Sequence, residues 1–392
     1  MITKTTPYAD YDYRKYLALL LNILLGLTIV CVSFRILAPA IFLMFVSSVV
    51  LLSRFKSPLR TYLFVGYIMM FFCSWYLLGL NHFERGPGKF TNLVLLLVFS
   101  FILFFLLGYQ DTRYRRKTWI NFFCISSIVY VLIVCVYSFL KGYPGYNLVY
   151  DVINGSEENS PLYALQLVLF TIVWLNNNWQ MRNIVMLTIM SLLCFSFSAV
   201  YLGSRAAFIL LVLFFAFKIP INSKRLALMC VMVSSLILFL LIFDFSQYSS
   251  LLDFGGFSDR GIDSPRFSML VYGFTHFLDY PFGGMQVQAE GYTGIWFHNM
   301  LLDLVRVSGT FVMFMWVLAL LFIGSILVKY RKHTRYLIVF IILNIALMQD
   351  LAFDGFFNIM ALEFYIMGHA IYLRNEFKSK VTRRNVKENT IY

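Results

Sequence analysis

The feature that most limits the fold of this chain is a series of apolar runs, most of them long enough to cross a bilayer. A helix needs about 20 mainly apolar residues to cross roughly 30 Å of hydrocarbon. Twelve runs are predicted to span, with those at 162–177, 206–220 and 336–350 being short; the others are 16–34, 36–53, 61–80, 91–109, 118–140, 183–201, 226–243, 310–328 and 359–373. Only helices satisfy their own backbone groups in lipid, and the runs lack the alternation of a barrel. The expected fold class is therefore an all-α polytopic membrane protein.

The composition and the spacing of the runs divide the chain into four regions. Of its 392 residues, 60% are hydrophobic and 13% are charged, a balance typical of an integral membrane protein. We expect spans 1–9 within 1–243, a large outward loop at 244–309 between spans 9 and 10, spans 10–12 within 310–373, and a basic cytoplasmic tail at 374–392. Within that tail, 378–392 is expected to be a disordered basic anchor.

The distribution of positive charge predicts the orientation. With the N-terminus in the cytoplasm, every second connection is cytoplasmic, and 24 of the 32 Lys and Arg residues fall on that side. Both termini are then cytoplasmic. The net charge of +13 is spread over cytoplasmic turns beside anionic lipid headgroups, so nucleic acid is not an expected partner. The six cysteines all fall within spans and show no metal-type spacing, so no metal or cofactor is expected.

Two outward connections are long. The segment 141–161 is rich in Gly, Pro and acids, which suits an ordered lip or a flexible flap. The second, 244–309, is long enough to indicate a function. Within it, Arg266 to Leu278 has helical apolar spacing and is expected to form an amphipathic helix at the membrane interface. Pro281, Gly283 and Gly284 end that helix. A second one is expected from about His298 to Val307, before Gly309 redirects the chain.

Arginines on the outer side are the first candidates for chemistry. Arg205 opens the eighth span, where unpaired helix N–H groups and a guanidinium would together hold a pyrophosphate. The alternative is an arginine that only fixes the depth of the span. Arg266 comes next, with Arg260 as a weaker companion, and Arg306 follows His298 by about two helical turns.

His298 is the second key position. An imidazole with an ordinary pKa near 6.5 accepts a proton from a sugar hydroxyl, as general-base catalysis requires; the alternative is a structural histidine. Asn299 and Asp303 follow it directly. Asp350 and Asp354 flank the outer end of the eleventh span, where they either bind substrate hydroxyls or mark the water line.

Glu363 lies within the last span, where a carboxylate is costly unless paired, and its expected partner is an arginine or His369.

Several classes are excluded. The chain has no P-loop, no dinucleotide-binding glycine fingerprint, no HExxH and no GxSxG. It has no DxD pair in an outer loop and no cytoplasmic insertion large enough to bind a nucleotide sugar. Any glycosyl donor must therefore be bound to lipid and reached from the outer face.

Three short motifs together resemble those of the O-antigen polymerase and O-antigen ligase superfamily of bacterial envelope enzymes. Their order around the outward loop and the twelve-span layout also match. The motifs are Ser204-Arg205-Ala206-Ala207, the Arg266 helix followed by Pro281-Phe282-Gly283-Gly284, and His298-Asn299 leading to Gly309. The chain departs from the family pattern in the residues after Arg205 and in its periplasmic loop, which is shorter than the family pattern.

The resemblance implies an inverting, metal-independent glycosyltransferase of lipopolysaccharide biosynthesis in the bacterial inner membrane. Its substrate would be an undecaprenyl-pyrophosphate-linked glycan at the periplasmic face. Arg205 and Arg266 would bind the pyrophosphate leaving group, and His298 would activate the acceptor hydroxyl. Arginine clamps suit this role because they stabilise charge that develops on the leaving group. Substrate contacts are expected from Arg260, Asn299, Asp303, Arg306, Asp350 and Asp354.

The acceptor separates the two activities. A polymerase uses a second lipid-linked glycan and a ligase uses lipid A-core, and the compact loop favours the polymerase. Membrane lipids and a chain-length regulator protein are further expected partners. The alternative from another class is a flippase or transporter of lipid-linked sugars. That class predicts internal repeats and charges near mid-membrane, whereas here the two halves differ and polar residues gather at one face.

Overall fold

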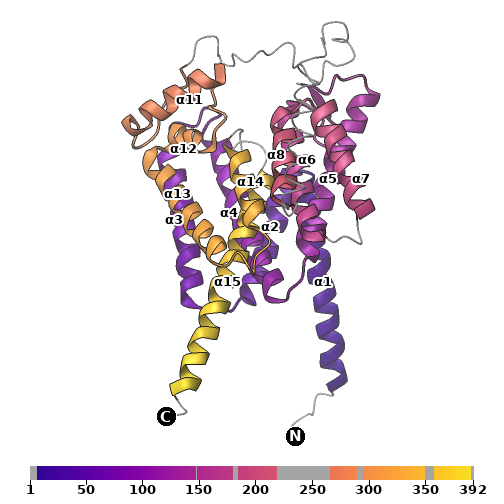
Figure 1. Ribbon diagram of the computed structural model, residues 1–392, viewed down its shortest axis with the longest axis vertical. Coiled ribbons are helices and arrows are strands. Elements are labelled where there is room, and N and C mark those ends of the chain that lie inside the picture. The colour runs from indigo at the N-terminus through magenta and orange to yellow at the C-terminus, as the bar shows by residue number, and fades with distance from the viewer. Residues whose placement is uncertain are drawn as a thin grey trace, which may run out of the picture.

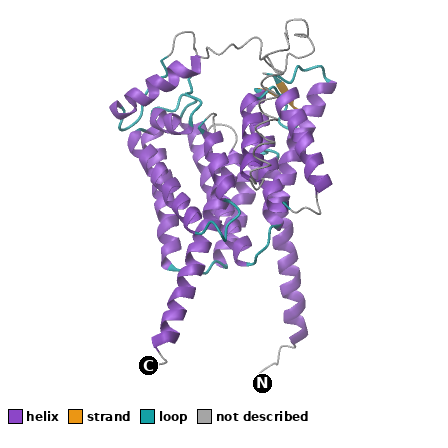
Figure 2. Cartoon of the chain, viewed as in Figure 1, coloured by secondary structure: helices purple, strands orange, loops and turns teal. Residues whose placement is uncertain are grey.

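The computed structural model describes residues 7–146, 148–179, 184–218, 265–288, 295–348 and 357–389. The described chain is almost entirely helical, with one two-stranded hairpin (Figure 2). Its elements are α1 (Pro7–Ser33), α2 (Leu37–Ser53), α3 (Leu59–Gly79), α4 (Pro87–Arg113), α5 (Thr118–Leu140), β1 (Val149–Asp151), β2 (Ser156–Glu158), α6 (Ser160–Asn178), α7 (Ile184–Phe195), the π-helix η2 (Ser196–Tyr201), α8 (Arg205–Lys218), α11 (Pro265–His276), the 3-10 turn η5 (Phe277–Asp279), α12 (Met300–Ser308), α13 (Thr310–Lys329), α14 (Leu337–Leu347) and α15 (Phe357–Asn389).

The lengths and apolar character of these helices agree with an all-α protein embedded in a membrane. Five described helices are long and apolar enough to cross a bilayer: α1 from Tyr16, α3, α4, α5 and α13. Shorter apolar helices are α2, α14, and the segments Val185–Ala199 and Ile209–Lys218. The ninth predicted span, 226–243, lies outside the described residues. The expected total of twelve spans therefore stays a prediction.

The two termini lie at the same end of the helix bundle, and α11 and α12 lie at the opposite end (Figure 1). We call the first the terminal end and the second the α12 end. The turns α4–α5 and α13–α14 belong to the terminal end. The hairpin β1–β2 belongs to the α12 end (Figure 2).

Helices α4 and α15 pack with their backbones almost in contact. A Cβ atom added at Gly108 of α4 would lie 2.0 Å from the carbonyl oxygen of Tyr365, and one added at Gly368 of α15 would lie 2.0 Å from that of Phe105. Small residues at a crossing permit this close approach, which is a common way for helices to associate in a bilayer. The pair forms the centre of the bundle, and α15 is buried along its first half, through Ile371.

The outward segment 141–161 is ordered in its described part by a buried carboxylate. Asp151 accepts hydrogen bonds from the hydroxyl groups of Tyr130 and Tyr163, the latter at 2.8 Å, and from Asn154. Arg35, in the α1–α2 turn, donates to the Tyr163 hydroxyl at 3.1 Å. Burial alone would raise the pKa of Asp151, but these donors hold it below its ordinary value. The lip interpretation agrees with this geometry.

The prediction of a disordered anchor at 378–392 is wrong for the described part, because α15 continues to Asn389. Residues 374–389 contain neither Gly nor Pro and are rich in Arg, Lys and Glu, which favour a helix. Asn375 also donates to the Thr61 hydroxyl at 2.8 Å, and Phe377 stacks on Tyr330. The basic segment therefore extends a core helix.

Candidate functional site

His298 stands in a strained turn directly before α12. Its backbone φ is +52°, in the left-handed region that few residues other than glycine adopt. Asn299 caps α12, accepting hydrogen bonds from the backbone N–H groups of Leu301 at 3.1 Å and Leu302 at 3.2 Å. The Asn299 amide also donates to the carbonyl of Met348, which directly follows α14, at 3.0 Å. The turn is thereby attached to two helices.

The carboxylate of Asp303 holds the backbone on both sides of His298. It accepts the N–H of Phe297 at 2.9 Å and the N–H of Asn299 at 3.2 Å. Asp303 is buried, and burial raises its pKa to about 6 against the opposing effects of Arg306 and of these two donors. The hydrogen bonds to Asp303 therefore stabilise the unfavourable backbone conformation of His298, whose side chain is half-buried.

Arg306 is buried beside this turn. One guanidinium nitrogen lies 2.9 Å from Glu84 in the α3–α4 connection, and Nε lies 3.7 Å from Asp303. The guanidinium carbon sits 4.0 Å from the centre of the Trp296 ring, a cation–π contact. Arg306 thus ties together α12, the α3–α4 connection and the chain before His298.

The Pro-Phe-Gly-Gly segment packs against the other end of α12. Gly284 donates to the carbonyl of Arg306 at 2.9 Å. Gly283, Gly284 and Gly309 all have positive φ, and a Cβ at Gly309 would lie 2.2 Å from the carbonyl oxygen of Pro281. Gly283 and Gly309 are required because a neighbouring backbone approaches too closely for a side chain, and Gly284 is favoured by its positive φ of +86°.

The helix that carries Arg266 is docked on the His298 turn. A Cβ added at Gly273 of α11 would lie 2.6 Å from Leu302 and 3.0 Å from the Phe297 ring. The opposite face of α11 exposes Val271 and Phe274, as expected for an interfacial amphipathic helix. Arg266 lies in the first turn of α11, and its side chain lies outside the described part of the structure.

Arg205 is the first residue of α8, as the sequence predicts. Gly203, at φ +61°, turns the chain, and the Ser204 hydroxyl accepts the N–H of Ala207 at 3.2 Å as a helix cap. The Tyr201 hydroxyl donates to the Tyr143 carbonyl at 3.2 Å, which places this turn beside the segment 141–161 at the α12 end. The Arg205 side chain lies outside the described part of the structure.

The structure brings together four of the predicted site residues, His298, Asn299, Asp303 and Arg306. The last three are 4%, 5% and 3% exposed and contact protein groups, which is the environment of residues that position a neighbour. The predicted substrate contacts Arg260, Asp350 and Asp354 lie outside the described residues.

Glu363 lies beside Asn344, whose amide approaches both carboxylate oxygens at 3.5 Å. This corrects the expected partner. His369 contacts Thr112 and Thr334 instead.

Sequence reasoning missed Glu84 and Trp296. Glu84 is 222 residues from Arg306 in the sequence, and no local pattern connects them. His82 was missed as well, and its ring lies 3.2 Å from the position of a Cβ atom added at Gly284. One signal was present, since the short outward connection between α3 and α4 carries this histidine together with an acidic and a basic residue.

In the described part of the chain, no group of three or more His, Cys, Asp or Glu side chains is placed to hold a metal ion. Comparison of the chain with protein-family models gave no match, and comparison with curated proteins gave none either.

Proposed function

We propose that this chain is a membrane glycosyltransferase that transfers a glycan from undecaprenyl pyrophosphate to an acceptor hydroxyl at the α12 end. The observation that carries the proposal is the His298 turn, in which Asp303 and Asn299 fix a histidine in a strained conformation before α12. Strained residues of this kind cluster at functional sites. The helices that begin near Arg205 and Arg266 open at the same end of the bundle.

The proposed reaction is a single displacement with inversion. The acceptor oxygen forms a bond to the anomeric carbon while the bond from that carbon to the pyrophosphate oxygen breaks. The acceptor proton passes to the His298 imidazole, and undecaprenyl pyrophosphate leaves. Arg205 and Arg266 stabilise the charge on the leaving group, while Asp303, Asn299 and Arg306 position His298.

In this proposal twelve spans cross the bacterial inner membrane, with both termini cytoplasmic and the α12 end periplasmic. The exposed apolar face of α11 then lies in the outer interface, where a lipid-linked donor would approach. A second lipid-linked glycan is the proposed acceptor, which makes the enzyme a polymerase of O-antigen type. Transfer to lipid A-core, as by a ligase, is the alternative.

Gel analysis of cell-surface polysaccharide tests the proposal in a strain that lacks the chromosomal copy. His298→Ala, Arg205→Ala and Arg266→Ala are each expected to abolish extended glycan, since loss of a general base alone costs about 10²- to 10⁴-fold. A single repeat on core identifies a polymerase, and bare core identifies a ligase.

Matched variants separate chemistry from folding. His276→Ala removes an exposed histidine whose ring, among the residues that the structure describes, forms hydrogen bonds only within α11, where it lies 3.0 Å from the Tyr272 carbonyl. Arg54→Ala removes an exposed arginine at the terminal end. Both are expected to retain glycan, and all variants are compared at equal amounts in the membrane. Extended glycan in all three site variants would refute the proposed site, and lipid-linked glycan accumulating in the cytoplasmic leaflet would indicate a flippase.

A further inference from the structure

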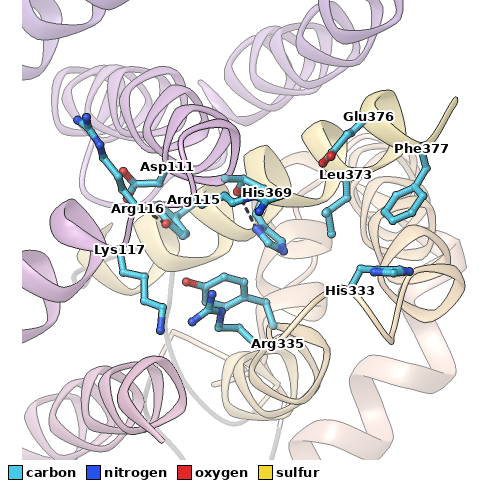
Figure 3. Close-up of a pocket in the computed structure, with 13 residues that line it drawn as sticks. Asp111, Arg115, Arg116, Lys117, His333, Arg335, His369, Leu373, Glu376 and Phe377 are labelled. Carbon is cyan, nitrogen blue, oxygen red and sulfur yellow. Dashed lines mark hydrogen bonds between the residues drawn. The ribbon is translucent and has the colours of Figure 1, made fainter. Parts of the chain in front are cut away.

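A polar cavity of about 330 Å³ opens at the terminal end, between the α4–α5 turn, the α13–α14 turn and α15 (Figure 3). The glycosyltransferase proposal makes no use of it, because it lies at the opposite end of the bundle from His298. Four cationic side chains line it: Arg115, Arg116 and Lys117 from the first turn, and Arg335 from the second.

The protein around these cations balances their charge only in part: Arg116 interacts electrostatically with Asp111, and the Lys117 ammonium donates to the carbonyl of Asn177. No ion pair between any of the four and a carboxylate is present within the described residues. The lining includes two carboxylates, Asp111 and Glu376, and Asp111 is buried and accepts the Tyr365 hydroxyl at 3.1 Å. The cavity therefore carries an excess of positive charge.

Lys117 shows the effect of this excess. Burial lowers its pKa, and the positive charge of Arg335 lowers it further. Positive side chains from two separate turns thus lie close together around the cavity. A bound anion would relieve this repulsion.

His369 links the end of α4 to the α13–α14 turn. The Thr112 hydroxyl donates to the Gly108 carbonyl at 2.7 Å, so the contact of 2.7 Å between Thr112 and His369 uses the N–H of Nδ1 as donor. Nε2 of His369 lies 3.0 Å from the hydroxyl of Thr334, so the two ring nitrogens join α4 to the α13–α14 turn. The two chain segments that carry the cations are thus held together before any ligand arrives, which reduces the entropic cost of binding.

We propose that this pocket binds a phosphate-bearing anion through Arg115, Arg116, Lys117 and Arg335. Its volume falls at the lower end of the range for small-molecule sites, which suits one or two phosphate groups with a short attached moiety. Guanidinium groups match the geometry of phosphate oxygens, and three of the four cations are arginines. The phosphate belongs either to the headgroup of an anionic lipid or to a soluble compound, and the two sources are separated by experiment.

The test uses the purified full-length chain and its tryptophan fluorescence during thermal unfolding. In one arm sodium pyrophosphate is titrated in nonionic detergent at constant ionic strength. In the other, nanodiscs of phosphatidylcholine are compared with nanodiscs containing phosphatidylglycerol. The pocket variant is Arg115→Gln with Arg335→Gln. The matched control is Arg54→Gln with Lys56→Gln, which removes the same charge from exposed side chains in the α2–α3 turn.

The wild-type chain and the control are expected to be stabilised in a saturable manner in at least one arm. The pocket variant should bind at least about tenfold more weakly, because each arginine supplies hydrogen bonds to a charged group. A pyrophosphate response that the control keeps and the pocket variant loses identifies a soluble ligand of this pocket, as distinct from pyrophosphate bound near Arg205 and Arg266. A response to phosphatidylglycerol alone that the pocket variant loses identifies a lipid headgroup, and either result supports the proposal. Equal responses of the pocket variant and the control would overturn it, as would the absence of any wild-type response in both arms.

Discussion

Replacement of Asp303 by asparagine gives the sharpest test of how His298 is held. Each carboxylate oxygen accepts one backbone N–H, from Phe297 at 2.9 Å and from Asn299 at 3.2 Å. An asparagine side chain at this position could accept only one of them, because its NH₂ group would face the other. Loss of a hydrogen bond to a charged acceptor costs about 1.5–3 kcal/mol.

This cost is comparable to the strain that the turn contains. A residue such as His298 in the left-handed region costs of the order of 1–3 kcal/mol and persists only when its surroundings impose it. With one of the two restraints removed, most molecules should leave the strained conformation. Because each 1.36 kcal/mol changes a rate tenfold, we expect Asp303→Asn to reduce glycan formation about 10- to 100-fold.

The assay is a double-mutant cycle on glycan formed per unit of membrane-inserted protein. If Asp303 acts through His298, the combination of Asp303→Asn with His298→Ala should be no worse than His298→Ala alone. Asp279→Asn, at an exposed carboxylate in η5, is the matched control and should retain full activity. Full activity in Asp303→Asn, or additive losses in the cycle, would refute this positioning role.

Three further predictions concern stability. Because the pKa of Asp303 is raised to about 6 in the folded protein, folding binds a proton between pH 4 and 6. The free energy of unfolding should therefore fall by at most about 3 kcal/mol as the pH rises through that window. Chemical denaturation of the wild type should show this fall, and that of Asp303→Asn should not. Gly108→Ala should abolish a monodisperse peak in size-exclusion chromatography because its Cβ would meet the Tyr365 carbonyl, whereas Gly66→Ala, with open space around its Cβ, should behave as wild type. Ser204→Ala removes the cap of α8 and should cost about 1 kcal/mol, seen as faster proteolysis near residue 204 than in wild type.

The apolar runs could be located from the sequence because burial in lipid leaves a long, uniform signal. The run 118–140 coincides with α5, and 310–328 ends one residue before α13 does. The two helices of the outward loop were also anticipated within about two residues, from apolar spacing in one case and from Gly309 in the other. Both signals depend only on residues close together in the sequence, so one sequence is enough to detect them.

Contacts between distant segments left no comparable signal. The pairing of Arg306 with Glu84 and its stacking on Trp296 depend on how α12 docks against α3 and its following turn. The hairpin β1–β2 was missed because its strands are three residues long, and its order depends on the buried carboxylate of Asp151. Helix α15 extends beyond the predicted end of the last span. Hydrophobicity sets the predicted end of a span, whereas helix propensity and local contacts set the end of a helix.

The contacts of each arginine in the structure distinguish positioning arginines from ligand-binding ones, which their positions in the sequence do not. From its spacing of about two helical turns after His298, Arg306 was expected to contact substrate. In the structure it lies beside two carboxylates and a tryptophan ring, so its charge is paired within the protein. At the terminal end, the sequence predicts only that basic residues lie in turns beside lipid headgroups. Arg115 and Arg335 in fact line a cavity, and they form no ion pair in the described part of the chain. A paired, buried cation stabilises architecture because removing it leaves a carboxylate without compensation. An unpaired cation at a cavity keeps its charge available for an anionic ligand, and this contrast supports assigning Arg306 to positioning and the terminal-end cations to binding.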